Sequence, residues 1–378
     1  MENNKRKRIC FLPNRLMLGG IEMVLVDALK VLHDKYDVEI IIFVDEQCET
    51  ILDRIPNDVK ITLKQLPKNR ILKRFSTIPF LSGFYFGKAI GKCHYDYLIT
   101  LRPSVIQACF ANKAKHKIYW SHNDFYKFYI KKQYSLKGKL KNYGFKLIYR
   151  QHDMIWTVSE TIQHEIEGKT QMNNIYALPN PINCSEINRK ATEECDLVFD
   201  TTKTNIVMIG RLSKEKGFDR VIRFMCNDVL NTFPNTHLYI MGGGGIEGYQ
   251  DFINKFEHKD KVSLIGPKDN PFPYLKQAQL LVCPSRDESF GLVLLEAMLL
   301  KIPIITTDTV GGRYVTQNNT LGCCVKNSDA SLQTAIENFL ENKDNYRYSL
   351  DNAQYWAEQH DLKFFEKRIL ALLEECDK

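Results

Sequence analysis

Two glutamates, Glu288 and Glu296, stand eight positions apart in the mostly apolar stretch ESFGLVLLEAMLL. On one continuous helix this spacing is a rise of about 12 Å and a turn of about 80°, so the two carboxylates could not share one metal ion or one proton. They would address different parts of an extended ligand. A nucleoside-diphosphate sugar has a suitable shape, with its ribose near Glu296 and its sugar near Glu288. The competing interpretation is an ordinary helix whose acidic first turn complements its macrodipole.

The helix is expected to begin near Phe290 and Gly291, after a strand and a loop that holds Glu288. The first backbone N–H groups of a helix have no partner within it. Those near Leu292 and Val293 would therefore point at an anion such as a phosphate. Gly291 permits close approach of the backbone to that group.

A second group of charged residues favours the phosphate interpretation. The segment IGRLSKEKGFDR carries Arg211 and Lys216 between Gly210 and Gly217, before an expected helix. Arginine offers a planar fork to phosphate oxygens and lysine a mobile point charge, which suits a diphosphate leaving group. Alone, such a pair is more often part of a solvent-exposed loop. Combined with the two glutamates, it makes the phosphate interpretation the stronger one.

These residues must be held by regular elements, and the sequence predicts an α/β fold. Short apolar runs alternate with helix-period segments in both halves, which is typical of a parallel sheet. The runs predicted as strands are 8–12, 38–44, 96–101, 117–121 and 154–158 in the first half, and 205–210, 236–241, 261–266, 279–284 and 302–307 in the second.

The chain of 378 residues is long enough for two domains. We expect two facing Rossmann-like domains, because the strand pattern restarts after a polar, acidic stretch. The predicted parts are an acceptor-binding domain at 1–183, a linker at 184–204, a donor-binding domain at 205–357, and a C-terminal helix at 358–378 that packs back on the first domain. Ligands of open α/β sheets lie beyond the carboxyl ends of the strands, so the site is expected in the cleft between the domains.

The motifs resemble those of the retaining glycosyltransferases of family 4, which have the two-domain GT-B fold. The resemblance is carried by GRLSKEKG and by PSRDESFGLVLLEAM, whose Glu288 and Glu296 match the family's pair of glutamates separated by seven residues. The segments LGGIEMVL, TVSE and LPNPI extend it over nearly the whole chain.

The resemblance implies roles for residues of the donor-binding domain. Arg211 and Lys216 would contact the donor diphosphate, with Arg211, Lys216 and Glu288 serving in catalysis. Glu296 would bind the ribose and Glu288 the transferred sugar near its reacting carbon. The remaining donor-binding residues would be Gly210, Phe290, Gly291, Leu292 and Val293.

In the first domain, the resemblance implies that Gly19 and Gly20 bring backbone N–H groups to the phosphates. It also places His122, a further catalytic candidate, near the donor sugar, with Asp124 a weaker candidate. An isolated Gly-Gly is usually only a turn, and an isolated histidine is more often structural. The position of each after a predicted strand is what favours function.

The expected reaction is transfer with retention of the anomeric configuration from a nucleotide sugar, with a UDP-sugar favoured as donor. No Asp-x-Asp pair occurs in the sequence, so we expect no metal and no other cofactor. The competing enzymatic interpretation is a nucleotide-sugar epimerase of the same fold. A glycosidase would need its carboxyl groups to face one bond and has no use for the diphosphate cations.

Charge divides the chain unevenly. Residues 1–182 hold 29 Lys or Arg against 17 Asp or Glu, and within 59–152 there are 20 basic residues and only two acidic ones, interleaved with aromatic residues. We expect this basic patch to bind the anionic surface of a membrane, where a lipid-linked or lipopolysaccharide acceptor is presented. The segment 74–92 would add an apolar insertion face. The alternatives are nucleic-acid binding, for which no recognition motif is present, and a basic face that is only solvated.

The sequence thus predicts an enzyme of bacterial surface polysaccharide or lipopolysaccharide synthesis at the inner face of the cell membrane. The first residues lack the apolar length of a signal peptide, and other apolar runs fall short of the roughly 20 residues of a membrane-spanning helix. The 11 cysteines have no C-x-x-C spacing, which favours reduced thiols and a cytoplasmic location.

Overall fold

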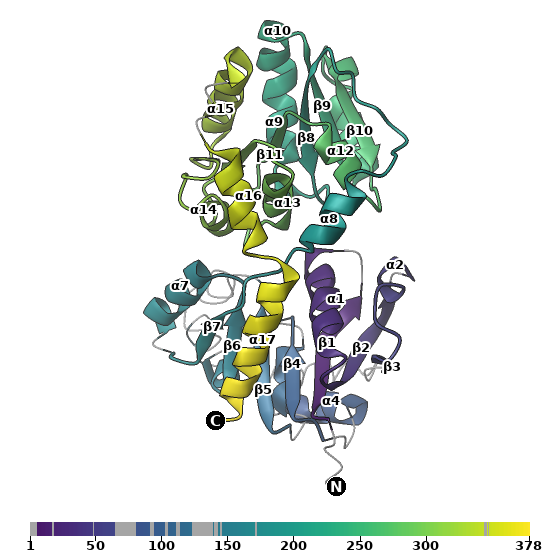
Figure 1. Cartoon of the computed structure of the whole chain (residues 1–378), viewed down its shortest axis with the longest axis vertical. Helices are drawn as coiled ribbons and strands as arrows, with labels where there is room; N and C mark the ends of the chain where they lie inside the picture. The colour runs from purple at the N-terminus through teal and green to yellow at the C-terminus, as the bar shows by residue number, and fades with distance from the viewer. Residues whose placement is uncertain are drawn as a thin grey trace. The chain divides into compact units, whose positions relative to one another are not determined.

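The structure is a computed structural model, and it describes residues 6–16, 19–47, 49–64, 81–90, 94–102, 105–110, 114–122, 139, 143, 146–170, 172–343, 346 and 348–378. Contacts divide the chain into two compact units, Met1–Pro181 together with Leu362–Lys378, and Ile182–Asp361. Each unit holds a parallel sheet with helices packed on it (Figure 1). The predicted fold class, two Rossmann-like α/β domains, is therefore confirmed, while the cleft between them stays a prediction.

The first unit contains a seven-stranded sheet among its described residues, in the order β3-β2-β1-β4-β5-β6-β7. Because its central strands are buried on both faces, they read as nearly continuous apolar runs in the sequence. The strands are β1 (Arg8–Leu16), β2 (Asp37–Gln47), β3 (Lys60–Leu63), β4 (Tyr97–Thr100), β5 (His116–Ser121), β6 (Met154–Thr157) and β7 (Ile175–Ala177). The helical elements are α1 (Gly20–Leu32), α2 (Glu49–Leu52), α4 (Ser82–Ile90), η1 (Ile106–Phe110), α7 (Glu160–Thr170) and α17 (Leu362–Cys376).

The second unit contains a six-stranded sheet in the order β10-β9-β8-β11-β12-β13. Its strands are β8 (Thr204–Ile209), β9 (Thr236–Met241), β10 (Val262–Gly266), β11 (Leu280–Cys283), β12 (Ile304–Thr307) and β13 (Cys323–Val325). The helical elements are α8 (Cys184–Lys190), η2 (Lys214–Lys216), α9 (Phe218–Phe224), η3 (Met225–Val229), α10 (Leu230–Thr232), α11 (Ile246–Ile253), η4 (Lys259–Lys261), α12 (Phe272–Lys276), α13 (Leu292–Leu299), α14 (Val310–Val315), α15 (Asp329–Glu341) and α16 (Leu350–Glu358).

Every strand predicted from the sequence is present, but β3, β7 and β13 were not predicted. All three lie at or beside an edge of a sheet and have three or four residues. Strand β3 is mostly exposed, so it lacks the apolar run that marks a buried strand. Such short strands are stabilised by their neighbours rather than by a pattern of their own.

The stretch expected as a linker, 184–204, begins with helix α8 and belongs to the second unit. The side chain of Asn183 accepts a hydrogen bond from the backbone N–H of Glu186 and so caps this helix. Lys190 and Glu186, which are one turn apart on this helix, form an ion pair of 2.7 Å that stabilises it further. The polar stretch thus begins with a capped helix, and the acidic residues within 193–200 lie in the turns and loop that follow it.

Helix α17 belongs to the first unit, although the second unit precedes it in the chain. Its apolar face, Phe365, Ile369 and Leu373, is buried, and it lies beside α1 (Figure 1). The ring of Phe365 stacks on that of Trp120 in β5 at a centroid distance of 6.1 Å. These residues are spaced so that they lie on one face of the helix, and this apolar face completes the core of the first unit.

Polar contacts fix the end of α17 through the carboxylate of Asp377. Lys7 Nζ lies 2.6 Å and Lys115 Nζ 3.1 Å from its oxygens, and the Tyr97 hydroxyl also donates to it. Partial burial alone would raise the pKa of Asp377, but the hydrogen bonds from Lys7, Tyr97 and Lys115 outweigh it and hold that pKa well below its usual range. The charged form of Asp377 therefore stabilises the docked helix.

We expect Asp377→Asn to loosen the last turns of α17. The loss of about 1–2 kcal/mol at pH 7 would raise amide hydrogen exchange there by about 5- to 30-fold. Since the pKa is lowered in the folded protein, the contribution of Asp377 is present above about pH 4 and is lost as the pH falls through the lowered value. The ratio of variant to wild-type exchange should therefore approach one in acid.

The control for this experiment is Glu375→Gln, because Glu375 lies in the last turn of α17 and its side chain makes an exposed contact of 2.8 Å with Lys378. It should leave exchange in α17 close to that of the wild type. Equal protection of α17 in wild type and Asp377→Asn at pH 7 would contradict the prediction.

Candidate active site

The second sheet reverses its strand order between β8 and β11. Strands β8 and β11 are paired and parallel, so their carboxyl ends lie side by side at the same end of the sheet. Reversal points of this kind bring the loops after two strands together and leave room beyond the carboxyl ends for a ligand. The loops are 210–217 after β8 and 284–291 after β11, which hold the charged residues singled out in the sequence.

The two loops touch at Gly217. Its φ is +71°, a left-handed conformation that favours glycine. A Cβ at this position would lie 2.2 Å from the carbonyl oxygen of Pro284, closer than any side chain tolerates. The absence of a side chain therefore lets the backbone of the loop after β8 pack directly on the loop after β11.

Helix α13 begins at Leu292, with Gly291 as its N-cap at φ +89°. The predicted start of this helix is confirmed. Gly291 has no side chain that could cap the first turn, and Leu292 and Val293 are partly exposed. The first N–H groups of a helix have no hydrogen-bond partner within it. This end of the helix carries partial positive charge next to the loop that holds Glu288.

The structure brings Lys216 and Glu288 together. Lys216 Nζ lies 2.6 Å from Glu288 Oε2, and the two side chains are only 27% and 13% exposed. Burial disfavours the charged form of Lys216, but the Glu288 carboxylate outweighs burial, so the pKa of Lys216 is raised. The hydroxyl of Ser285 also donates to Glu288 Oε2 at 3.3 Å. The pair is thus a fixed positive and a fixed negative charge at the edge of the sheet.

Arg211 is placed differently from Lys216. It follows Gly210 at the end of β8, its side chain is 70% exposed, and its guanidinium lies 3.9 Å from the carboxylate of Glu215. Its positive charge nevertheless tends to lower the pKa of Lys216, but this effect is smaller than that of the Glu288 carboxylate. Arg211 is therefore an exposed, movable cation beside the buried pair.

The other predicted donor residues lie on or beside α13. Glu296 lies within this helix and is partly exposed. The Phe290 side chain is buried and packs against the rings of Tyr314 and His360 at 5.3 and 5.9 Å. The side chain of Phe290 thus supports the loop from within the core.

In the first unit, Gly19 is the N-cap of α1 and Gly20 its first residue. The structure adds two residues that the sequence analysis missed. Glu22 is buried with its carboxylate over Gly19, where a Cβ would meet Glu22 Oε2 at 2.8 Å. Arg102, after β4, donates from Nη2 to Glu22 Oε1. Two features of the sequence could have indicated these residues. Glu22 is an acid in the first turn after Gly19 and Gly20, and Arg102 directly follows a predicted strand.

His122 lies at the end of β5 and is buried. In the part of the chain that the structure describes, neither of its ring nitrogens has a hydrogen-bond partner. Burial, with a smaller contribution from the charge of Arg102, lowers the pKa of His122 to about 3. The ring is therefore neutral at pH 7. Asp124 lies outside the described residues, as does much of the basic patch, including 65–80 and 123–138.

Among the described residues, no group of three or more His, Cys, Asp or Glu side chains is arranged to hold a metal ion. Within those same residues, none of the helices combines the length and apolar character needed to cross a membrane.

We expect Gly217→Ala to destabilise the protein by about 2–4 kcal/mol, because the new methyl group would clash with the Pro284 carbonyl and the residue would stay at positive φ. Thermal and urea unfolding of the variant measure this. Gly248→Ala is the matched control, since Gly248 lies in α11 and a Cβ there would meet no atom within 4 Å. A variant at 217 as stable as the control would show that the loops do not depend on this contact.

The chain is similar to known proteins in sequence and in fold. Residues 190–356 match the family model of glycosyl transferases group 1. A glycosyltransferase of Methanocaldococcus jannaschii is 29% identical over 201 residues, which is 52% of this chain and 48% of that protein. An N-acetylgalactosaminyltransferase of Campylobacter jejuni, named for a diphospho-undecaprenol glycan, is 24% identical over 334 residues, 85% of this chain and 87% of that protein.

A solved structure has the same fold. HepE of Anabaena, crystallised with UDP, superposes with a TM-score of 0.71 at 17% identity, covering 97% of this chain and all of HepE. The alignments with the first three curated relatives span only 48%, 58% and 64% of the lengths of those proteins. Residues 190–356 are thus similar to the glycosyl transferases group 1 family, and the chain has the two-sheet GT-B fold.

Proposed function

We propose that this chain is a retaining glycosyltransferase of family 4, which moves a sugar from a nucleotide-diphosphate sugar to a lipid-linked glycan. The observation that carries the proposal is the contact of 2.6 Å between Lys216 and Glu288. It places a cation and a carboxylate at the carboxyl ends of β8 and β11, beside the uncapped start of α13. A donor that carries a diphosphate next to a sugar needs both charges in one place.

The positive charges are proposed to receive the leaving diphosphate. When the bond between the anomeric carbon and the phosphate oxygen breaks, negative charge builds on that oxygen. The Lys216 ammonium, the N–H groups at Leu292 and Val293, and the exposed guanidinium of Arg211 are proposed to stabilise it. Charges that are already in place cost no reorganisation during the reaction, and this contribution is usually the largest in catalysis.

The carboxylates are proposed to hold the two sugars of the donor. Glu288 would bind the transferred sugar near its reacting carbon, and Glu296 the ribose hydroxyls from its position along α13. Retention requires the acceptor oxygen to attack from the face that the diphosphate leaves. The acceptor hydroxyl then gives its proton to the departing phosphate oxygen, and the products are the glycoside and the nucleoside diphosphate. No step requires a metal ion, in agreement with the absence of an Asp-x-Asp pair.

The first unit is proposed to complete the site and to bind the acceptor. Backbone N–H groups at Gly19 and Gly20 would approach the phosphates, with the buried Glu22–Arg102 ion pair holding the start of α1. The neutral ring of His122, whose nitrogens are free of described partners, would offer one donor and one acceptor to a sugar hydroxyl.

The similar proteins support the proposed donor and acceptor classes. HepE was solved with UDP and with UDP-glucose, which supports a UDP-sugar as donor. The Campylobacter jejuni relative is named for a sugar chain on diphospho-undecaprenol, which supports a lipid-linked acceptor of bacterial surface polysaccharide or lipopolysaccharide synthesis. The basic excess of residues 1–182 would then hold the enzyme at the anionic inner face of the cell membrane.

The proposed function is tested by donor binding and product analysis. Thermal-shift screening of UDP-, GDP- and other nucleotide sugars should identify a UDP-sugar that stabilises the protein. Incubation with that donor and a lipid-linked glycan in EDTA should give a product whose anomeric configuration, measured by NMR, matches the donor. Inversion, or activity that EDTA abolishes and Mg²⁺ restores, would contradict the mechanism. Conversion of the donor sugar without any acceptor would instead identify an epimerase.

We expect Glu288→Gln to lower the transfer rate by about 100- to 1,000-fold, because the carboxylate acts at the reacting carbon. Its donor Kd should change by less than about tenfold, whereas Lys216→Ala should weaken donor binding itself. Glu341→Gln, which alters an exposed glutamate of α15, is the control and should behave as the wild type. Normal turnover by Glu288→Gln would exclude the proposed site.

A further inference from the structure

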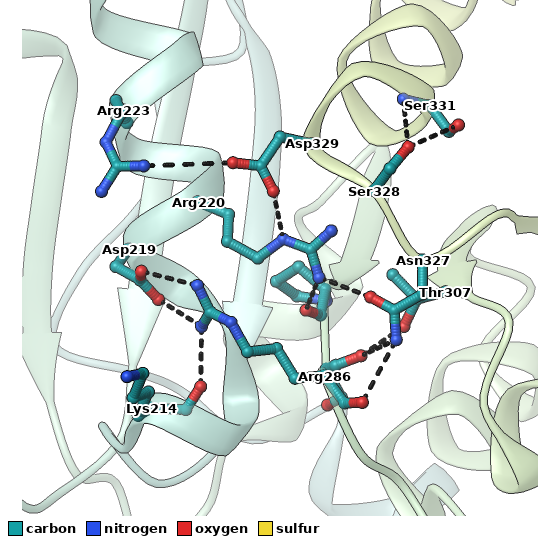
Figure 2. Close-up of polar contacts among 12 residues, drawn as sticks. Lys214, Asp219, Arg220, Arg223, Arg286, Thr307, Asn327, Ser328, Asp329 and Ser331 are labelled. Carbon is teal, nitrogen blue, oxygen red and sulfur yellow. Dashed lines mark hydrogen bonds and ion pairs between the residues drawn. The ribbon is translucent and has the colours of Figure 1, made fainter.

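Arg286 joins the two loops that carry Lys216 and Glu288. It stands two residues before Glu288 in the loop after β11, and its backbone N–H donates to the carbonyl of Glu215 at 2.7 Å. Its guanidinium Nη1 donates to the carbonyl of Lys214, also at 2.7 Å (Figure 2). Both carbonyls belong to the η2 turn, which ends at Lys216. Arg286 thus connects the turn that presents the ammonium to the loop that presents the carboxylate.

The guanidinium is itself held in one orientation by Asp219. Nη1 and Nη2 of Arg286 lie 2.7 and 2.8 Å from the two carboxylate oxygens of Asp219, at the start of α9. The hydrogen bonds from Arg286 lower the pKa of Asp219, so the pair is charged at neutral pH. A two-point contact of this kind fixes the plane of the guanidinium, which a lysine could not reproduce.

A separate group of contacts holds the backbone carbonyls of Pro284 and Arg286 in the loop after β11. Arg220 is buried on α9, and its guanidinium donates to Asp329 and Asn327, each at 2.7 Å, and to the Pro284 carbonyl at 3.4 Å. Asn327 in turn donates to the Arg286 carbonyl at 3.2 Å (Figure 2). Arg220 therefore anchors the loop after β11 to the core of the unit, while the Arg286 side chain reaches across to the loop after β8.

We propose that Arg286 is a positioning residue for the sugar transfer described above, and the proposal rests on that function. By binding Asp219 and the Lys214 carbonyl, Arg286 sets the distance between the Lys216 ammonium and the Glu288 carboxylate. Both groups then meet the donor at the same time, one at the diphosphate and the other at the sugar. Small displacements of such groups lower catalytic rates strongly, even when substrate binding is retained.

The position of Arg286 suits this role better than direct contact with the donor. Both of its terminal nitrogens are engaged by Asp219 and Lys214, and its side chain is only 35% exposed. Its effect should therefore pass through Lys216. This sets Arg286 apart from Arg211, which is 70% exposed and makes a single contact of 3.9 Å with Glu215.

The experiment compares Arg286→Ala with Arg286→Lys in the transfer assay, using the UDP-sugar identified by thermal shift. Arg286→Ala should lower kcat by about 10- to 100-fold and change the donor KM by less than about threefold. Arg286→Lys keeps the charge and one of the contacts, so it should recover part of the loss. Arg223→Ala is the matched control, because Arg223 also lies on α9 but is 53% exposed and 4.0 Å from Asp329.

Combining substitutions tests whether Arg286 acts through Lys216. In protein that already carries Lys216→Ala, Arg286→Ala should have almost no further effect on kcat. Full additivity of the two effects would overturn the proposal. So would an Arg286→Ala variant whose kcat per folded molecule, corrected by its unfolding curve, equals that of the wild type.

Glu288→Gln separates this proposal from the function on which it rests. If Glu288→Gln loses transfer and Arg286→Ala does not, only the positioning role is overturned. If both variants turn over normally, the proposed active site itself is wrong.

Discussion

The site of the second unit depends on one steric constraint, the contact between Gly217 and the carbonyl of Pro284. At this point the backbones of the two loops approach closely because residue 217 has no side chain, and a Cβ there would lie 2.2 Å from the Pro284 carbonyl oxygen. This contact brings the η2 turn against the loop after β11, and Lys216 and Glu288 lie 2.6 Å apart next to it. Arg220 donates both to Asp329 at the start of α15 and to the Pro284 carbonyl, so it connects the same loop to α15.

The site holds a largely buried ion pair, Lys216–Glu288, and one solvent-exposed cation, Arg211. Lys216 keeps its charge in a largely buried place because Glu288 compensates it, whereas Arg211 remains in solvent. A phosphate that approaches Lys216 would meet an ammonium with few water molecules to displace, so their attraction is stronger than on an open surface. Burial of Lys216 would therefore strengthen its attraction to a phosphate, whereas the exposed Arg211 side chain could move with a bound phosphate.

The sequence predicts those features that are written in local patterns. Apolar runs locate the buried strands, and Gly291 before LVLLEAML marks the start of α13. Contacts between distant positions leave no local pattern. Arg286 and Asp219 are 67 positions apart, and Glu22 and Arg102 are 80 apart, so only the strand order brings them together. The short edge strand β13 was missed because three partly buried residues carry no periodicity.

The return of α17 to the first unit affects the order in which the chain can fold during synthesis. Phe365, Ile369 and Leu373 complete the first core, yet the ribosome makes them after the whole of Ile182–Asp361. Domains usually fold one after another from the N-terminus. Here the second unit is continuous in sequence and can fold while the first unit still exposes the apolar side chains, such as Trp120, that α17 covers. The nascent first unit is therefore the part that would depend on a chaperone.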